Sequence, residues 1–188
     1  MTRPDASPRR RPRTDGLRNR ERLLAMGREH LWKNGFELSA AAVASDAGVG
    51  IGTLYRHFAT RDELVEAVLA DFLTEVEIEL DTVEVTESGI DALKEYARRL
   101  TAVGGHGLRD IILSNPESTP GLADRRQEIR RRGGALISRA QSQGTIRADF
   151  TLDDLHVFLC AVAGLRADER VDDELVDRFV GDHLEGLR

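Results

Sequence analysis

The chain has 188 residues, of which 40% are hydrophobic, 32% charged and 5% aromatic. This length is enough to bury one large core or two small ones. No apolar run approaches the roughly 20 residues that a membrane-spanning helix needs, and the residues after Met1 do not form a signal-peptide pattern. The single cysteine, Cys160, excludes an internal disulfide. We therefore expect a cytoplasmic protein that does not contact a membrane.

The net charge of −6 is unevenly distributed along the chain. Residues 1–60 carry eleven Lys or Arg and six Asp or Glu, a net charge of +5, whereas residues 61–188 carry sixteen and twenty-seven, a net charge of −11. A basic N-terminal end attracts the phosphates of nucleic acid, and an acidic remainder favours one orientation of approach. The charge distribution therefore favours a DNA-binding N-terminal part.

The first 13 residues are rich in Arg and Pro and poor in apolar side chains, so we expect them to be disordered. Two interpretations remain open: an inert tail, or a basic arm that lies along a minor groove or the phosphate backbone. A first helix is predicted over residues 15–34, and Gly35 ends it. Its expected apolar side consists of Leu17, Leu23, Leu24, Met26, Leu31 and Trp32.

Residues 39–58 have the pattern of two short helices joined by a tight turn. Ser39 is placed to cap the first helix, and Gly48 can adopt the left-handed conformation that the turn requires. Leu54 and Phe58 are four residues apart, so they share the buried face of the second helix. Its other faces carry groups that can reach phosphates or base edges. The predicted DNA-binding residues are Ser39, Gly50, Ile51, Gly52, Thr53, Tyr55, Arg56 and His57.

The string AGVGIGTLYRHF, followed by TRDELVEAVL, closely resembles the DNA-binding domain of the TetR family of bacterial transcription regulators. The resemblance is strong over roughly residues 17–70. It departs at Ile51, where many members carry Lys, and at His30, Leu31 and Trp32, where members often show an apolar-aromatic pair followed by a small residue. The resemblance implies a homodimer that binds a double-stranded DNA operator and is released from it by a small-molecule effector.

The remaining segments have the pattern of further helices separated by loops. A capping box at residues 60–63 starts a helix that we expect to end near Leu80, with a loop at 81–87. Helices are predicted at 88–103, 108–112, 122–143, 151–167 and 172–186, with a loop at 115–121. Gly133 and Gly134 indicate a kink or a close helix contact. The whole chain is thus expected to be all-α, with about nine helices.

The two last predicted helices have more apolar surface than one small body needs, because every residue from 157 to 163 is apolar. We expect them to form a two-fold dimer interface. The candidate interface residues are Leu155, Phe158, Val162, Leu175, Phe179, Val180 and His183.

An effector pocket is predicted where a glycine-rich break separates two central helices. Its candidate residues are Phe72, Leu93, Tyr96, Leu100, His106 and Arg109. The arginines at 125, 126, 130, 131 and 132 have two open interpretations: a solvated helix face offset by acids, or a site for an anionic effector. Cys160 is either a buried small hydrophobe or a redox sensor.

We find no nucleophile elbow, phosphate-binding loop or metal-ligand spacing, so we expect neither an enzyme nor a bound cofactor or metal. The expected domains are a basic arm at 1–13, a three-helix, helix-turn-helix DNA-binding head at 14–59, and a helical effector-binding and dimerisation body at 60–188. The expected function is a sequence-specific transcription regulator, with repression implied by the resemblance. The alternative is a helical ligand-binding or scaffold protein without specific DNA readout.

Overall fold

The computed structural model describes residues 12–86, 89–102, 119–166 and 168–186. Within these ranges the chain is all-α, as predicted, with two short 3₁₀ helices, Gly35–Glu37 and Pro120–Leu122. The α-helices are α1 (Pro12–Asn34), α2 (Ala40–Asp46), α3 (Ile51–His57), α4 (Arg61–Thr86), α5 (Gly89–Ala102), α7 (Ala123–Ser142), α8 (Leu152–Arg166) and α9 (Asp173–Glu185).

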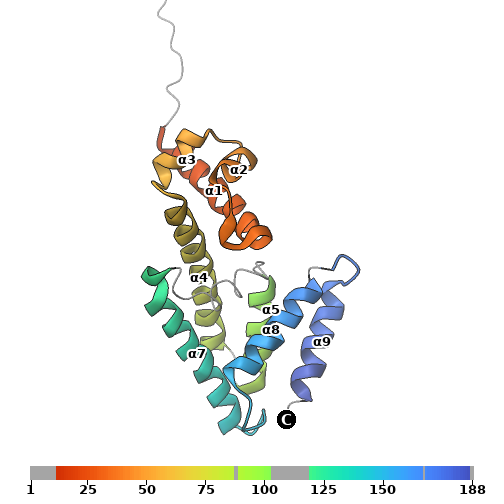
Figure 1. Cartoon of the computed structure of the whole chain (residues 1–188). Coiled ribbons are helices and arrows are strands. Elements are labelled where there is room, and N and C mark those ends of the chain that lie inside the picture. Colours follow the sequence, from red (N-terminus) through yellow and green to blue (C-terminus); the bar gives the residue numbers. More distant parts are fainter. Residues whose placement is uncertain (1–11, 87–88, 103–118, 167, 187–188) are drawn as a thin grey trace, which may run out of the picture.

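The helices form two parts that share α4 (Figure 1). Helices α1, α2 and α3 make a head at one end of the molecule, and α5, α7, α8 and α9 make a body at the other. Helix α4 packs on α1 in the head and on α5 and α7 in the body. Its 26 residues span about 39 Å, because an α-helix rises 1.5 Å per residue. A single rigid element therefore connects the two parts.

The core of the head is built from leucines and valines that are completely buried. Leu23 and Leu31 of α1, Val43 of α2 and Leu54 of α3 have no exposed surface. The prediction for α1 was wrong at two of its six apolar positions, since Leu17 is 64% and Trp32 42% exposed. The head therefore uses only part of the apolar side expected for α1.

Helix α4 is longer than its sequence pattern indicates. The loop predicted at 81–87 is wrong, because the helix continues to Thr86. Val83 in this extension is fully buried, and Arg132 of α7 donates hydrogen bonds to Asp81 at 2.7 Å and to Glu84 at 2.8 and 2.9 Å. These contacts with a segment about 50 residues away stabilise a turn that local propensity does not favour.

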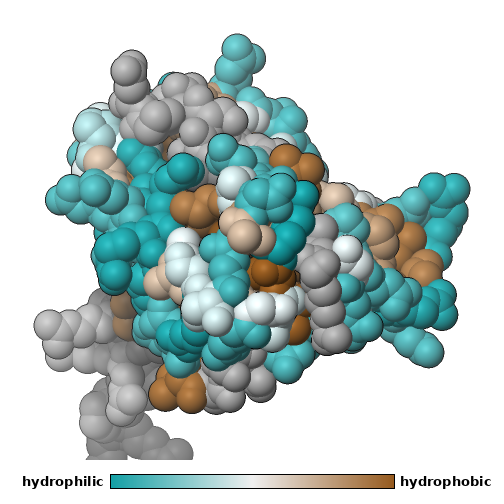
Figure 2. All heavy atoms as spheres, turned by 90° about the horizontal axis from the view of Figure 1, so that it is seen from below, coloured by the Kyte–Doolittle hydropathy of each residue, from teal (hydrophilic) through white to brown (hydrophobic). Residues whose placement is uncertain are grey.

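In the body, α8 begins with a capped turn, and one of the two predicted roles of Gly133, a close helix contact, is found. The Thr151 hydroxyl accepts the Asp154 N–H at 3.2 Å, and the Asp154 carboxylate accepts the Thr151 N–H at 2.8 Å, which forms a reciprocal cap on α8. Gly133 lies at a close contact of α7 with α8, since an added Cβ there would lie 3.3 Å from the Leu152 side chain. Seen from below in Figure 2, the end of the body away from the head is mostly hydrophilic, with separate hydrophobic spots.

Some predictions concern residues outside the described ranges. These are the helix at 108–112, most of the loop at 115–121, and residues 1–11 of the basic segment. The described part of that loop includes the 3₁₀ helix Pro120–Leu122. Helix α1 starts at Pro12, so it includes the last two residues of the predicted basic segment.

Candidate DNA-binding surface and effector pocket

The α2–α3 pair has the local geometry that the sequence predicts for a helix-turn-helix. The Ser39 hydroxyl accepts the Ala42 N–H at 3.4 Å and caps α2. Gly48 has a φ of 67°, and the next residue, Val49, donates its N–H to the Ala44 carbonyl at 3.0 Å. Gly48 is needed here because a side chain in this left-handed conformation is strained. The turn thus fixes the angle between α2 and α3.

Helix α3 has one buried side and one broad exposed side. Leu54 and Phe58 are buried in the head, whereas Ile51 is 44% and Tyr55 48% exposed. Gly50, Gly52 and Arg56 are also exposed, and Thr53 and His57 are half-buried. The predicted DNA-binding residues on this helix are therefore all at least partly accessible, and Ser39 at the start of α2 is exposed as well.

Two of these side chains are oriented by contacts within the head. Arg56 donates a hydrogen bond to the Thr53 hydroxyl at 2.9 Å, which holds the guanidinium along the exposed side of α3. The His57 ring lies 6.3 Å from the Phe58 ring, measured between centroids. The Arg20 guanidinium of α1 lies 5.5 Å from the centroid of the Phe58 ring. The C-terminal end of α3 is therefore held by α1.

The head is also attached to α4 by charged groups. Arg28 of α1 donates two hydrogen bonds of 2.8 Å to Glu75 and one of 3.4 Å to Asp71. Its guanidinium lies 5.8 Å from the centroid of the Phe72 ring. Bidentate arginine–carboxylate contacts fix both distance and orientation. Arg28 therefore fixes α1 against α4 at the junction of head and body.

A mostly apolar pocket lies in the body between α4, α5, α7 and α8. Its described lining residues are Phe72, Leu73, Val76, Tyr96, Leu100, Arg126, Ile129, Arg130, Gly133, Leu152, Leu155, His156 and Leu159. Phe72 connects the pocket to the head, because its ring is the one beneath Arg28. One residue is thus shared by the pocket wall and the head–body junction.

The predicted pocket residues are only partly found in this wall. Phe72, Tyr96 and Leu100 line the pocket, whereas Leu93 is fully buried elsewhere in the core. His106 and Arg109 lie outside the described residues. The predicted pocket residues include none from α8, and α7 entered only through the open interpretation that its arginines bind an anionic effector. The four-residue spacing of Arg126 and Arg130, with Ile129 between them, could have indicated an inward face of α7.

The predicted dimer residues also divide into two groups. Leu155, Phe158, Val162 and Val180 are buried within the single chain, so little of their surface is left for a partner to cover. Leu155 lines the pocket instead. The reason is that α8 packs on both α5 and α9, which cover one side of its apolar run.

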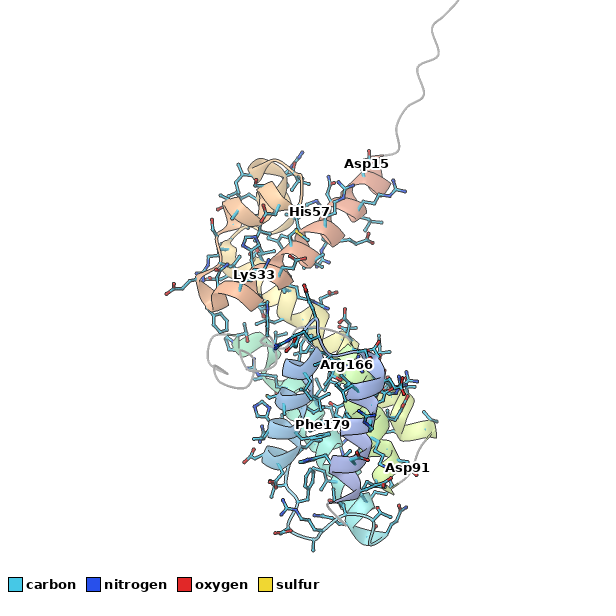
Figure 3. The ribbon with its side chains drawn as sticks, turned by 90° about the vertical axis from the view of Figure 1, so that its right-hand side faces the viewer. Asp15, Lys33, His57, Asp91, Arg166 and Phe179 are labelled. Atoms are coloured by element: carbon cyan, nitrogen blue, oxygen red, sulfur yellow. The ribbon has the colours of Figure 1, made fainter. Side chains whose placement is uncertain are left out.

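An exposed surface remains on α8 and α9. Leu175 is 40% and Val157 66% exposed, and His183 is exposed as well. Phe179 is half-buried, and its ring lies 5.7 Å from the His183 ring, measured between centroids. Seen from the side in Figure 3, Phe179 lies in the body, well away from His57 and Lys33 in the head.

Among the described residues there is no group of three or more His, Cys, Asp or Glu side chains that could hold a metal ion. Cys160 is half-buried, with its sulfur 3.7 Å from Nε2 of His156, one turn earlier on α8. A membrane-spanning helix, long and apolar enough for a bilayer, does not occur in the ranges that the structure describes.

Fold and site together define an all-α protein with a helix-turn-helix head and a helical body that contains a pocket. Two family profiles match the chain. Residues 23–68 match "Bacterial regulatory proteins, tetR family", and residues 88–188 match "Transcriptional regulator SbtR-like, C-terminal domain". The chain therefore belongs to the TetR family of DNA-binding transcriptional regulators, a family that is not enzymatic.

Solved structures of family members are similar over most of their length. A TetR regulator from Mycobacterium vanbaalenii is 27% identical, with 94% of this chain and 98% of that chain covered and a TM-score of 0.59. The regulator SCO0520 from Streptomyces coelicolor is 25% identical, with 90% and 98% covered and a TM-score of 0.57. AibR, solved in complex with isovaleryl coenzyme A and operator DNA, shares the fold at 20% identity, with 89% and 98% covered and a TM-score of 0.70.

Proposed function

We propose that the protein is a repressor that leaves a palindromic operator when a small molecule binds in its body. The observation that carries this proposal is the exposed side of α3, where Ile51, Tyr55 and Arg56 are accessible while Leu54 holds the helix in the head. An α-helix that presents polar and apolar side chains in this way fits the major groove. The alternative, a ligand-binding or scaffold protein without DNA readout, gives this surface no role.

The proposed DNA contacts use different chemistry at different positions. Tyr55 and His57 supply hydroxyl and imidazole groups for phosphates, and Arg56 supplies a guanidinium for phosphate or guanine. Gly50 and Gly52 leave room for the backbone to approach the duplex. Together with Ser39, Ile51 and Thr53, these residues form the proposed DNA-binding surface on a head that extends from about residue 14 to 59.

The proposed homodimer uses the exposed surface of α8 and α9. Val157, Leu175, Phe179 and His183 supply apolar and aromatic groups that a second copy can cover by the same surface. Two heads related by a two-fold axis would then contact half-sites about 34–36 Å apart, or a multiple of that distance. The correct spacing of the two heads is what an effector would disturb.

Helix α4 provides a physical route for that disturbance. It contributes Phe72, Leu73 and Val76 to the pocket and is attached to the head by Arg28. Helix α7, which also lines the pocket, is held to α4 by Arg125 and Arg132. A molecule inserted between these helices would therefore shift α4 and the head with it. The AibR structure, which holds both a ligand and operator DNA, is consistent with such a regulator.

Selection of bound duplexes from a random DNA pool tests the proposal. We expect the full chain to enrich an inverted repeat, and the enriched duplex to bind with an affinity that falls steeply with salt. Enrichment of no sequence, with binding that is equal for all duplexes, would contradict specific readout and favour the scaffold alternative.

A further inference from the structure

The arginines of α7 have two distinct surroundings, which the sequence alone did not separate. Arg125 donates hydrogen bonds to Glu77 at 2.9 and 2.7 Å, and Arg132 is held by Glu84 and Asp81. Their hydrogen bonds to Glu77 and Glu84 raise the pKa of the two guanidinium groups. Arg131 is paired with Glu128 on the exposed side of the helix. These three positive charges are therefore offset by carboxylates.

The other two arginines line the pocket. Arg126 and Arg130 are one helical turn apart and both belong to the pocket wall. Arg126 is only 7% exposed, and it donates hydrogen bonds to the hydroxyl oxygen of Thr119 at 2.7 Å and to its carbonyl oxygen at 3.1 Å. These contacts hold the planar guanidinium in one orientation. A guanidinium keeps its charge in proteins, so Arg126 places a permanent positive charge at the pocket.

The rest of the described wall strengthens this positive character. No Asp or Glu is present among the described lining residues. The other walls are apolar, with Phe72, Leu100 and Leu159 from three different helices. This arrangement occurs in a chain whose net charge is −6, so general basicity does not explain it.

We infer that the pocket binds an anionic amphipathic molecule, with an oxyanion head group on an apolar body of acyl-chain type. The head group, a carboxylate or a phosphate, is held by Arg126 and Arg130, because guanidinium groups bind such oxyanions through paired hydrogen bonds. The apolar body lies against Phe72, Leu100 and Leu159. At the buried Arg126 the low local dielectric constant increases the attraction between head group and guanidinium. The inference names the ligand class of the proposed effector site, and it rests on the proposed function only for its effect on DNA binding.

Titration calorimetry of the full chain with four probes of equal chain length tests the inference. Octanoate and octyl phosphate carry the two candidate head groups, octanamide is neutral, and octylammonium is cationic. We expect at least one of the two anions to bind about tenfold or more tightly than octanamide, since hydrogen bonds to charged groups are stronger than those to neutral ones. Octylammonium should bind most weakly. Comparison of octanoate with octyl phosphate identifies the preferred head group.

Two variants and a matched control locate the head group. Arg126→Gln and Arg130→Gln should each weaken binding of the preferred anion by about tenfold or more, with little change for octanamide. Arg131→Gln removes the same charge from the exposed side of α7 and should leave the affinity unchanged. If Arg126→Gln fails to fold because it loses the Thr119 contacts, Arg130→Gln tests the same site from an exposed position.

Equal affinities for the anions and octanamide, or full anion affinity in Arg130→Gln, would overturn the inference. Operator binding is measured in parallel without any probe. If the chain binds its operator but neither anion, the inferred ligand class is wrong and the proposed function is unaffected. Arginine-dependent anion binding by a chain that binds no duplex supports the ligand class and contradicts the proposed function instead.

Discussion

The head and the body present their candidate functional side chains in opposite ways. In the head, one seven-residue helix carries Ile51, Tyr55 and Arg56 on its exposed side. In the body, four helices turn side chains such as Arg126 and Leu159 inward around a pocket. A single exposed helix can contact a DNA duplex, whereas a small molecule has to be enclosed by helices that are distant from one another in sequence. The two sites therefore depend differently on tertiary structure.

The largest effect is expected for a charge placed where the body is proposed to dimerise. Phe179→Asp puts a carboxylate next to the rings of Phe158 and His183, whose centroids lie 6.3 and 5.7 Å from the Phe179 ring. Covering an unpaired charge in the interface costs several kcal/mol. The variant should sediment as a monomer and lose most operator affinity.

Phe179→Leu is the matched control for this variant, because it keeps the position apolar. It should remain a dimer with nearly the wild-type affinity for the operator. A dimeric Phe179→Asp with unchanged operator affinity would mean that the two heads are held together by another surface.

A smaller effect, confined to stability, is expected inside the head. Leu54 is completely buried beneath α3. Leu54→Ala removes packed methyl groups and leaves a cavity, which should lower the free energy of unfolding by about 2–5 kcal/mol. Chemical denaturation followed by circular dichroism measures this loss. A change of less than about 1 kcal/mol would show that α3 is not anchored by this contact.

Tyr55, the next residue along α3, should affect operator affinity and leave stability unchanged. Tyr55→Ala changes an exposed side chain, so stability should stay within about 0.5 kcal/mol of wild type. Operator affinity should fall by about 1–3 kcal/mol if the hydroxyl and ring contact DNA. Ile78→Ala, which shortens an exposed apolar side chain of α4 in the body, is the control and should bind normally. Fluorescence anisotropy with a labelled operator measures the affinity of both variants. Wild-type affinity in Tyr55→Ala would show that Tyr55 does not contact DNA.

The smallest effect is expected for the N-terminal segment. Deleting residues 1–11 removes four arginines and one aspartate and leaves α1 complete. If the segment contacts phosphates, the slope of log affinity against log salt concentration should become shallower by about 0.9 for each lost contact. Identical slopes for the two proteins would show that the segment is an inert tail.

The fold and the head were predictable because their signals are local. The spacing of Gly48, Leu54 and Phe58 defines a turn and a buried face within eleven residues. The capping box at the start of α4 is equally local, and it is present as hydrogen bonds between Glu63 and residues 59 and 60. Such patterns need no knowledge of the rest of the chain.

The body was less predictable because its signals depend on partners distant in sequence. The last turns of α4 are stabilised by hydrogen bonds from Arg132, which lies about 50 residues away in the sequence. No local pattern shows that contact. The apolar run of α8 indicates burial but does not show which side α5 and α9 cover. Val162 was therefore assigned to a partner surface although it belongs to the core.

The most direct test compares an inverted-repeat operator with a single half-site. The full chain is titrated against both duplexes, and sedimentation equilibrium counts the chains on each. Two heads held by one body should bind the inverted repeat as two chains per duplex, about 100-fold or more tightly than the half-site. One chain per duplex, with equal affinity for repeat and half-site, would contradict a DNA-reading head paired through the body.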